Sequence, residues 1–190
     1  MTSVERFDEA VDGLFERLRG HRAVDRVLYG ASALGEFGLL WVILAVLRGL
    51  RGEHHWRAAV RAGAAVGVES VVVNAGIKSL FRRRRPVADG PRPYPLRIPL
   101  TSSFPSGHAT SAFCSATLLA DGDPALAPLY YGAATVVALS RIHVRIHHAS
   151  DVAGGIAIGL ALGRLGRRLV PLEPPAGRNA GRGRRRWRVS

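Results

Sequence analysis

A long apolar run near the start of the chain limits what this sequence can fold into. Residues 27 to 47, VLYGASALGEFGLLWVILAVL, contain a single charged side chain, Glu36. At about 1.5 Å of rise per residue, a helix of this length crosses a hydrocarbon core of about 30 Å. The run therefore predicts a membrane-spanning helix.

Further apolar segments follow, and together they predict an all-α transmembrane bundle of about five spans. The second segment, 58 to 77, is interrupted by Arg61, Glu69 and Asn74 but still has the length and character of a span. The remaining segments are 103 to 120, 124 to 140 and 152 to 170. The arginines near the end of the last segment can reach the lipid headgroups.

Glycine spacing predicts close packing in two of these segments. Gly155, Gly159 and Gly163 recur every four residues in the last segment, and Gly63 and Gly67 do so in the second. Small residues at this spacing leave a smooth face against which another helix backbone can pack closely. We therefore expect both faces to lie against neighbouring helices.

Composition favours a membrane protein over a nucleic-acid-binding protein. The 190 residues are 47% hydrophobic and carry a formal net charge of +13. A nucleic-acid-binding protein can carry such a charge but does not need long uncharged runs, whereas a membrane protein places arginine where it meets lipid headgroups. We expect membrane lipids and no nucleic acid as partners, and the sequence leaves the oligomeric state open.

Both ends of the chain are predicted to lie outside the membrane domain, which we assign to residues 27 to 170. Residues 1 to 26 have acidic and apolar side chains near helical spacing, which predicts an amphipathic helix on the membrane surface or across the end of the bundle. They are rich in acids and arginines, unlike a cleavable signal peptide, so the apolar run that follows is predicted to be a permanent anchor. Residues 171 to 190 are predicted to be a disordered basic tail.

Three polar clusters border the apolar segments. Lys78 and the four arginines from Arg82 to Arg85 follow the second span, FPSGH opens the third, and SRIHVRIHHASD, residues 140 to 151, joins the fourth to the fifth. In an antiparallel five-helix bundle, the end of span two, the start of three, the end of four and the start of five lie on one side. The topology therefore brings the three clusters together on one membrane face.

The cations of these clusters suit an oxyanion. Lys78, Arg85 and Arg141 are side chains of the kind that hold a phosphate or another tetrahedral oxyanion. The PSGH sequence that ends at His108 adds a hydroxyl and backbone N–H groups where a helix begins, and the positive end of a helix dipole is itself an anion site. We therefore expect an anion-binding site.

The same clusters contain groups suited to nucleophilic and acid–base chemistry. His147 and Asp151 stand four residues apart, so in a helix they would share a face and the carboxylate would orient the imidazole. An imidazole held in this way suits a nucleophile or base. His108, arriving from another helix, is a second imidazole that can handle the leaving-group proton.

At these residues the sequence resembles a known family, the type 2 phosphatidic acid phosphatases, which share their site with vanadium haloperoxidases. The family pattern is present as K-x6-R-P from Lys78 to Pro86, as P-S-G-H from Pro105 to His108, and as S-R-x5-H-x3-D from Ser140 to Asp151. The resemblance covers roughly residues 27 to 170. Many lipid-acting members have six spans rather than five, and the amphipathic N-terminal helix is a candidate for the sixth.

The resemblance implies a metal-free phosphatase that uses no cofactor. His147 would attack phosphorus and form a phosphohistidine that water later hydrolyses, while Asp151 would orient His147. His108 would donate a proton to the departing oxygen. The groups that would hold the phosphoryl oxygens are Lys78, Arg85, Ser106, Gly107 and Arg141.

Several neighbouring polar residues have simpler interpretations. The arginines before Arg85 fit a positively charged membrane border, with Arg82 placed about one helical turn from the site. His143 and His148 are expected to be bystanders. Glu36 and Glu69 fit a functional role and a structural one equally well, the latter being an ion pair inside the bundle with Arg61 or a contact with a polar helix face.

A metal site and two other functions use the same residues. His143, His147 and Asp151 have a spacing that would suit a metal ion, but the neighbouring arginines would repel a cation, so we expect none. A vanadate-dependent halogenating enzyme would use the same oxyanion cage, and a transporter or non-catalytic binder would hold anionic lipid without releasing phosphate. A lipid phosphatase is favoured, because a small membrane chain suits a lipid substrate and binding alone does not need His147 and Asp151 together.

The expected substrate is a lipid phosphate held at headgroup depth. The proline-rich stretch RPVADGPRPYPLRIPL, residues 85 to 100, would flank the site and leave the hydrocarbon tail between helices. A polyprenyl phosphate or diphosphate is the first choice, followed by phosphatidic acid or phosphatidylglycerol phosphate.

The distribution of arginine predicts the orientation of the site. Arg48, Arg51 and Arg57 lie on the same side as the basic tail, and the positive-inside rule places that side in the cytoplasm. The site would then face outward, although the arginines of the N-terminal segment oppose this assignment.

Overall fold

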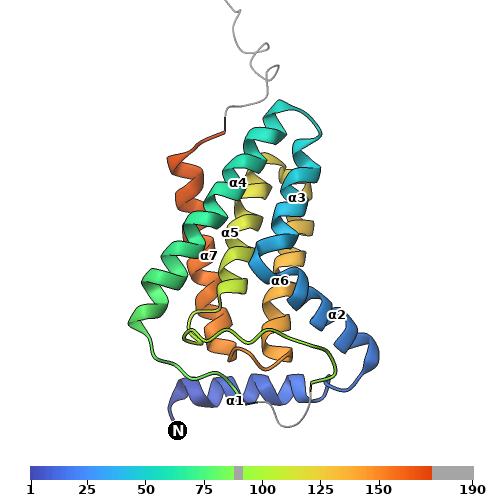
Figure 1. Cartoon of the computed structure of the whole chain (residues 1–190), viewed down its shortest axis with the longest axis vertical. Coiled ribbons are helices and arrows are strands. Elements are labelled where there is room, and N and C mark those ends of the chain that lie inside the picture. The colour runs from blue at the N-terminus through green and yellow to red at the C-terminus, as the bar shows by residue number, and fades with distance from the viewer. Residues whose placement is uncertain (88–91, 173–190) are drawn as a thin grey trace, which may run out of the picture.

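The computed structural model describes residues 1–87 and 92–172, and within them the fold is helical with no strand, as expected for an all-α bundle (Figure 1). The α-helices are α1 (Ser3–Glu16), α2 (Arg22–Leu34), α3 (Leu39–Gly49), α4 (Glu53–Val71), α5 (Gly107–Gly122), α6 (Ala127–His143) and α7 (Ala149–Leu169). Short helical turns are η1 (Glu36–Gly38), η2 (Val72–Gly76), η3 (Ile77–Leu80) and η4 (Pro124–Leu126).

Helix α5 forms the centre of the bundle. It packs against α4, α6 and α7, and its Ala109, Ala112 and Ala116 are fully buried. Two of its buried hydroxyl groups, those of Thr110 and Thr117, donate to backbone carbonyl oxygens one turn earlier, at 2.9 Å and 2.7 Å. Small side chains therefore let three neighbouring helices approach α5 without leaving buried polar groups unpaired at these positions.

The predicted glycine face of the last segment is confirmed. A methyl group at Gly155 would lie 2.6 Å from the carbonyl oxygen of Ser106, and one at Gly159 would lie 2.4 Å from that of Thr110. Helix α7 therefore contacts the backbone of α5 directly. The matching prediction for Gly63 and Gly67 is wrong, because a methyl group at either position would meet no atom within 4 Å.

The first predicted span is bent rather than straight. Helices α2 and α3 meet at 65° across η1, where Phe37 and Gly38 adopt positive φ angles of 52° and 69°. Hydropathy does not register such a bend, because it depends on backbone conformation and not on side-chain polarity. The bend carries Glu36 into the interior of the bundle end, beside α5.

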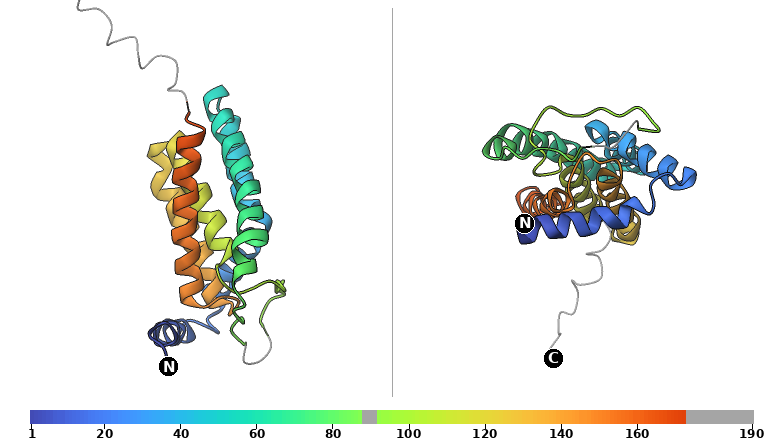
Figure 2. Two further views of the ribbon diagram at one scale, coloured as in Figure 1. Left: turned by 90° about the vertical axis from the view of Figure 1, so that its left-hand side faces the viewer. Right: turned by 90° about the horizontal axis from the view of Figure 1, so that it is seen from below.

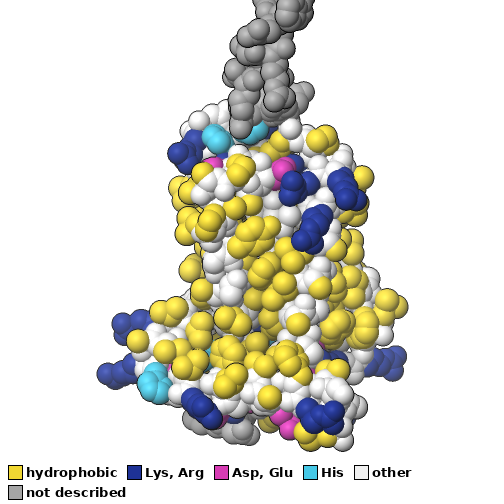
Figure 3. All heavy atoms as spheres, turned by 180° about the vertical axis from the view of Figure 1, so that it is seen from behind, with side chains coloured by type: hydrophobic (Ala, Val, Ile, Leu, Met, Phe, Trp, Pro, Cys, Tyr) yellow, Lys and Arg dark blue, Asp and Glu magenta, His cyan; other side chains and the backbone are white. Residues whose placement is uncertain are grey.

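The apolar surface agrees with a membrane protein. Among the described residues, Glu53–Leu80 and Pro124–His143 are long and apolar enough to cross a bilayer, and the bent pair of α2 and α3 makes a third if it is counted as one span. Hydrophobic side chains cover the middle of the bundle, and lysine and arginine gather towards its two ends (Figure 3). The span count of five stays a prediction, since α5 has 16 residues and α7 ends in arginines.

Helix α1 lies across one end of the bundle (Figures 1 and 2). This is one of the two positions that we expected for the amphipathic helix, the other being the membrane surface. It is shorter than the predicted segment 1 to 26, because it ends at Glu16 and a new helix begins at Arg22. Val11 and Phe15 pack against the core, while its one buried residue is an acid, Asp8. The predicted basic tail lies almost wholly outside the described residues.

Two arginines at the opposite end serve the fold. Arg48 is buried and forms an ion pair with Asp123, so it is not the loop cation that the sequence suggested. Arg61 is buried too and lies 2.8 Å from Asp121, so it pairs with neither Glu36 nor Glu69. These pairs tie α3 and α4 to the end of α5, far from the polar clusters.

Candidate active site

The three polar clusters meet at the end of the bundle that α1 covers. Helices α5 and α7 begin there, α6 and η3 end there, and the proline-rich segment crosses in front of them (Figures 1 and 2). The convergence predicted from an antiparallel topology is therefore confirmed. A cavity of about 500 Å³ opens at this end, and its wall includes Lys78, Gly107, His108 and His147.

His147 lies in the tight connection between α6 and α7 and is only 3% exposed. Its backbone N–H donates to the carbonyl oxygen of Arg141 at 3.2 Å, which folds the connection back over the end of α6. Arg145 takes a positive φ of 51° to allow this turn. The four-residue spacing from Asp151 had suggested that His147 lies on a helix. The backbone of the connection holds the imidazole instead.

Asp151 is fully buried in the first turn of α7 and faces the Nδ1 side of His147. The Nδ1 atom lies 3.7 Å from Oδ2 of Asp151, and the hydroxyl of Ser103 lies beside both atoms. Ser103 donates to the same carboxylate oxygen at 2.6 Å and lies 3.5 Å from Nδ1. The predicted pairing of His147 with Asp151 is present, with Ser103 as a partner that the sequence did not reveal.

Arg83 joins the same carboxylate to the N-terminal helix. Its guanidinium lies 2.6 Å from Oδ1 of Asp151 and 2.6 Å from Oδ2 of Asp8. Asp8 also accepts from the backbone N–H of Ser150 at 2.7 Å and from its hydroxyl at 2.8 Å. A chain of ionic contacts therefore runs from α1 through Arg83 to the residue that faces His147.

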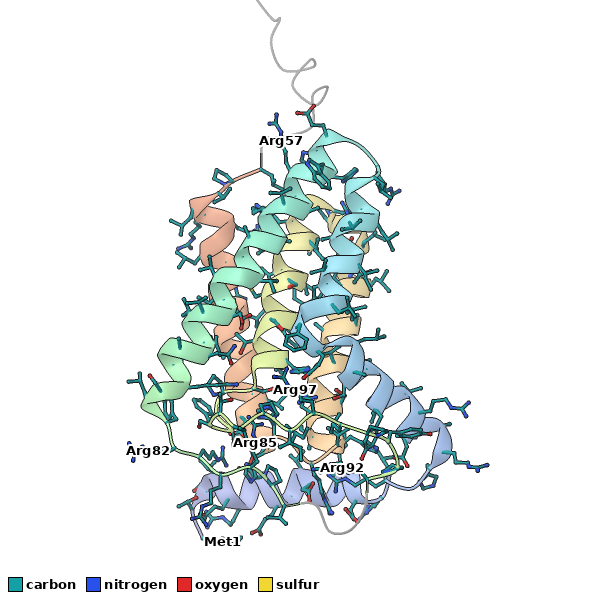
Figure 4. All side chains as sticks on the ribbon, in the orientation of Figure 1. Met1, Arg57, Arg82, Arg85, Arg92 and Arg97 are labelled. Carbon is teal, nitrogen blue, oxygen red and sulfur yellow. The ribbon has the colours of Figure 1, made fainter. Side chains whose placement is uncertain are left out.

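The sequence interpretation of the arginine run was wrong for Arg83. The residues before Pro86 form no helix, and exposed and half-buried side chains alternate along them. Arg83 and Arg85 face the site, whereas Arg82 and Arg84 are exposed, and Figure 4 shows Arg82 directed away from the bundle. The restriction that proline places on the preceding residue could have predicted that Arg85 is not helical, but nothing in the sequence singles out Arg83.

Arg85 lies against the other nitrogen of His147. One of its terminal nitrogens is 3.2 Å from Nε2, and the guanidinium also donates to the carbonyl oxygens of Pro99 at 3.0 Å and Ile146 at 3.1 Å. Because guanidinium groups only donate, Nε2 must be the acceptor and Nδ1 carries the ring proton. The free electron pair of His147 therefore points towards the arginine and away from Asp151.

Burial sets the protonation state of His147. It lowers the pKa of the imidazole to about 3, and Arg141 and Arg85 act in the same direction. The hydrogen-bonding influence of Asp151 opposes this effect but does not overcome it. His147 is therefore neutral near pH 7, as a nucleophile or base requires.

The remaining predicted phosphate-binding groups surround this centre. Nζ of Lys78 lies 3.4 Å from the hydroxyl of Thr101 and 3.6 Å from the position of a methyl group at Gly107. Arg141 is 1% exposed and donates to Ser32, while two of its nitrogens have no hydrogen-bond partner among the described residues. Buried donors left unpaired in this way are available to an anion.

Ser106 was predicted to bind phosphate, and in the structure it caps helix α5. It is fully buried, it caps α5 by accepting from the N–H of Ala109 at 3.5 Å, and its own N–H donates to the backbone carbonyl oxygen of Asp151 at 3.0 Å. Gly107, the next residue, opens α5 and lines the cavity. The positive end of α5 therefore faces the cavity at Gly107.

His108 lines the cavity from the first turn of α5 and has a much sparser environment. Its Nε2 lies 3.4 Å from a carboxylate oxygen of Glu36 without the geometry of a hydrogen bond. A methyl group at Gly35 would lie 2.7 Å from the ring, so the bend before η1 needs glycine there. Glu36, which the sequence left open, belongs to this site through His108.

The two other histidines of the cluster lie off the cavity. Nε2 of His143 is 2.7 Å from Asp25, on the side where α2 packs on α6, so it turns away from His147. His148 does contact the site, because its Nδ1 lies 3.2 Å from Asp151, but it acts as the cap of α7. In the described part of the chain, no three His, Cys, Asp or Glu side chains are arranged to hold a metal ion.

Comparisons with known proteins agree with this geometry. Residues 68–174 match the family model described as the PAP2 superfamily. The decaprenylphosphoryl-5-phosphoribose phosphatase of Mycobacterium tuberculosis is 38% identical over 127 residues, which are 66% of this chain and 69% of that protein. The enzyme of the same name from Mycolicibacterium smegmatis is 39% identical over 136 residues, or 68% of this chain and 71% of that protein.

A solved structure has the same fold. The transmembrane PAP2-type phosphatidylglycerolphosphate phosphatase of Bacillus subtilis superimposes with a TM-score of 0.68 at 25% identity, covering 89% of this chain and 87% of that one. The family model covers more than half of the chain and includes all three polar clusters. Taken with the site geometry, these matches show that the chain belongs to the PAP2 superfamily.

Proposed function

We propose that the protein is a membrane phosphatase that removes the terminal phosphate of a lipid and uses His147 as its nucleophile. The observation that carries this proposal is the pair of imidazoles, His147 and His108, on the wall of one cavity. Nε2 of His147 carries the free electron pair and lies beside Arg85, where a phosphoryl oxygen would replace the present contact. The Nδ1 side faces Ser103 and Asp151, which hold the ring in this tautomer.

The reaction proceeds in two balanced steps. In the first, Nε2 of His147 bonds to phosphorus while the bond from phosphorus to the lipid oxygen breaks, and His108 protonates that oxygen. In the second, water attacks the phosphohistidine, His108 accepts a proton, and phosphate leaves. The positive charges of Lys78, Arg85 and Arg141, with the N-terminus of α5, stabilise the phosphoryl oxygens in both steps.

The favoured substrate is a polyprenyl lipid that ends in a phosphate. The mycobacterial relatives are named for a decaprenyl lipid, and the B. subtilis structure is named for phosphatidylglycerol phosphate, which stays the second choice with phosphatidic acid. The apolar surface around the bundle would receive the hydrocarbon tail while the phosphate lies at headgroup depth (Figure 3).

Phosphate release from a panel of purified lipid phosphates tests this function. The full chain in detergent should release phosphate from a polyprenyl phosphate lipid and should keep this activity in EDTA, because the cage already supplies cationic charge. Release from none of the lipids, with the lipids still bound, would identify a non-catalytic binder. Loss of activity in EDTA with recovery in zinc or magnesium would contradict the metal-free mechanism.

We also propose that the site faces outward. The opposite end of the bundle presents the exposed Arg51 and Arg57 in the α3–α4 region, and the positive-inside rule places that end in the cytoplasm. Labelling of single cysteines at Thr2 and Ser190, in a Cys114→Ser background, tests the assignment. External labelling at Thr2 alone supports it, and external labelling at Ser190 alone reverses it.

A further inference from the structure

The cavity extends past the two imidazoles to a cationic group that lies outside the family pattern. Arg97, from the proline-rich segment, lines the cavity together with Phe37 of the bend between α2 and α3. Its guanidinium stands 4.9 Å from the centre of the Phe37 ring. Figure 4 shows Arg97 near the middle of the bundle end, on the same side as Arg85.

The backbone holds Phe37 in an unusual state. Its φ of 52° lies in the left-handed region, which bulky residues rarely adopt, and its side chain is 82% exposed. Such strained conformations gather at sites that contact ligands. The Phe37 ring is not buried, so burial does not offset the strain. The strained conformation instead places the ring against Arg97 at the cavity wall.

Arg97 acts electrostatically on Glu36 across the cavity but forms no ion pair with any described residue. In the described residues its guanidinium contacts the Phe37 ring and has no hydrogen-bond acceptor. Arg92, from the same segment, instead donates to the carbonyl oxygens of Val144 and Arg145. An arginine positioned over an aromatic ring keeps its planar set of N–H donors available to an anion.

The relatives are named for lipids with a shared chemical feature. Decaprenylphosphoryl-5-phosphoribose and phosphatidylglycerol phosphate each carry two phosphates, a diester next to the lipid and a terminal monoester beyond a short polyol or sugar. If the monoester lies at His147, the diester must lie farther along the cavity. A cavity of about 500 Å³ has room for such a headgroup.

We infer that Arg97, supported by Phe37, binds the non-scissile phosphodiester of a substrate with two phosphates. This inference rests on the proposed lipid phosphatase function and deepens it, because it makes the protein selective for lipids with a phosphorylated polar headgroup. The hydroxyl and amide groups of Ser70, Asn74 and Ser111 line the same cavity and face the polyol or sugar between the phosphates.

Kinetics with two lipids of identical acyl chains test the inference. Phosphatidylglycerol phosphate has both phosphates, whereas phosphatidic acid has only the terminal one. Arg97→Gln should lower kcat/KM for phosphatidylglycerol phosphate about tenfold or more, mainly through KM, and should change kcat/KM for phosphatidic acid less than about twofold. Arg97→Lys should recover part of the loss, since it restores the charge but not the planar donors.

Arg92→Gln is the matched control, because Arg92 lies in the same segment but bonds only to backbone carbonyl oxygens. It should not discriminate between the two lipids. Equal losses on both lipids in the Arg97→Gln variant, or no loss on either, would overturn the inference.

A binding measurement separates this inference from the proposed function. If the wild-type chain hydrolyses neither of these lipids and no polyprenyl phosphate lipid either, the proposed function fails, and binding of phosphatidylglycerol, which has the diester alone, becomes the criterion. Binding that is about tenfold weaker in Arg97→Gln than in wild type supports the inference. Equal binding overturns it.

Discussion

The two imidazoles of the cavity are held in very different ways. His147 is 3% exposed, with Ser103 and Asp151 on one side and Arg85 on the other. His108 has two polar neighbours, the carboxylate of Glu36 at 3.4 Å and the backbone of Ser32. A nucleophile must meet phosphorus along one line of approach, so prior orientation favours it, whereas a proton donor can serve leaving groups that differ in position.

The network around His147 extends to the surface of the molecule, and the environment of His108 does not. The carboxylate of Asp151 contacts the side chains of Ser103, His148 and Arg83. Arg83 in turn forms an ion pair with Asp8 on α1. Glu36, by contrast, sits in a bend with positive φ angles between α2 and α3. A network of hydrogen bonds and ion pairs therefore positions His147, whereas the bent backbone at Glu36 forms the surroundings of His108.

Removal of the nucleophile should have the largest effect. His147→Ala should lower the hydrolysis of lipid and aryl phosphates alike, by about four orders of magnitude or more, because the attacking atom is lost. Phosphate release from both substrates measures this. The control is His21→Ala, an exposed histidine with no side-chain capping bond. Robust aryl phosphate turnover by the His147 variant would contradict its role.

The second effect should depend on the leaving group. His108→Ala should lower lipid hydrolysis by about 10² to 10⁴-fold, because a lipid alkoxide needs a proton to depart. An aryl phosphate leaves as a stable phenolate, so its hydrolysis should fall much less. Thermal unfolding must first show that the variant is folded. Equal losses on both substrates would indicate that His108 binds phosphate or supports the fold instead.

The third prediction concerns the ionic chain from α1. Asp8→Asn removes the charge that holds Arg83 against Asp151, so misorientation of His147 should lower kcat about ten- to a hundredfold with little change in KM. Asp8→Glu should recover part of the activity. Glu9→Gln is the matched control on the same helix, since Glu9 is exposed and does not contact Arg83. An unchanged kcat in Asp8→Asn would rule out this positioning role.

The smallest expected effect is the absence of a titration. Because burial lowers the pKa of His147 to about 3, the folded protein does not bind a proton there between pH 7 and pH 5, whereas the unfolded chain binds one below about pH 6.5. The free energy of unfolding is therefore unaffected by this histidine above pH 6.5, and it decreases as the pH falls from 6.5 towards 3.

Nitrogen-15 NMR of labelled histidines, with His147→Ala for assignment, should show a neutral His147 ring between pH 7 and pH 5. A titration midpoint near pH 6.5 would contradict this prediction.

Sequence reasoning predicted the main outline of the site, because each motif residue carries its own chemistry. Lys78, Arg85, His108 and His147 were expected to converge from an antiparallel topology, and they do. Arg83 was missed because a run of arginines looks uniform until the contacts of each side chain are known. Ser103 and Asp8 were missed because a hydroxyl or carboxylate gains its role only from tertiary contacts.

The fold was predictable where apolar character decides it and not where backbone geometry does. The apolar runs indicated the helices, yet the run from 27 to 47 did not reveal the 65° bend at Phe37 and Gly38. The same four-residue glycine spacing marks a contact face in α7 and an open face in α4. The glycine spacing is identical in the two cases, so only the presence of a closely packed neighbouring helix separates them.

In the proposed mechanism His147 carries the phosphoryl group while His108 serves the leaving group. Rapid acid-free quenching during turnover of a phosphorus-32 aryl phosphate, followed by peptide mapping, locates the phosphoryl group. We expect an acid-labile, alkali-stable phosphoryl group on the peptide that contains His147, in wild type and in His108→Ala, and none in His147→Ala. A label on His108, or a label that persists in His147→Ala, would rule out this assignment of the two histidines.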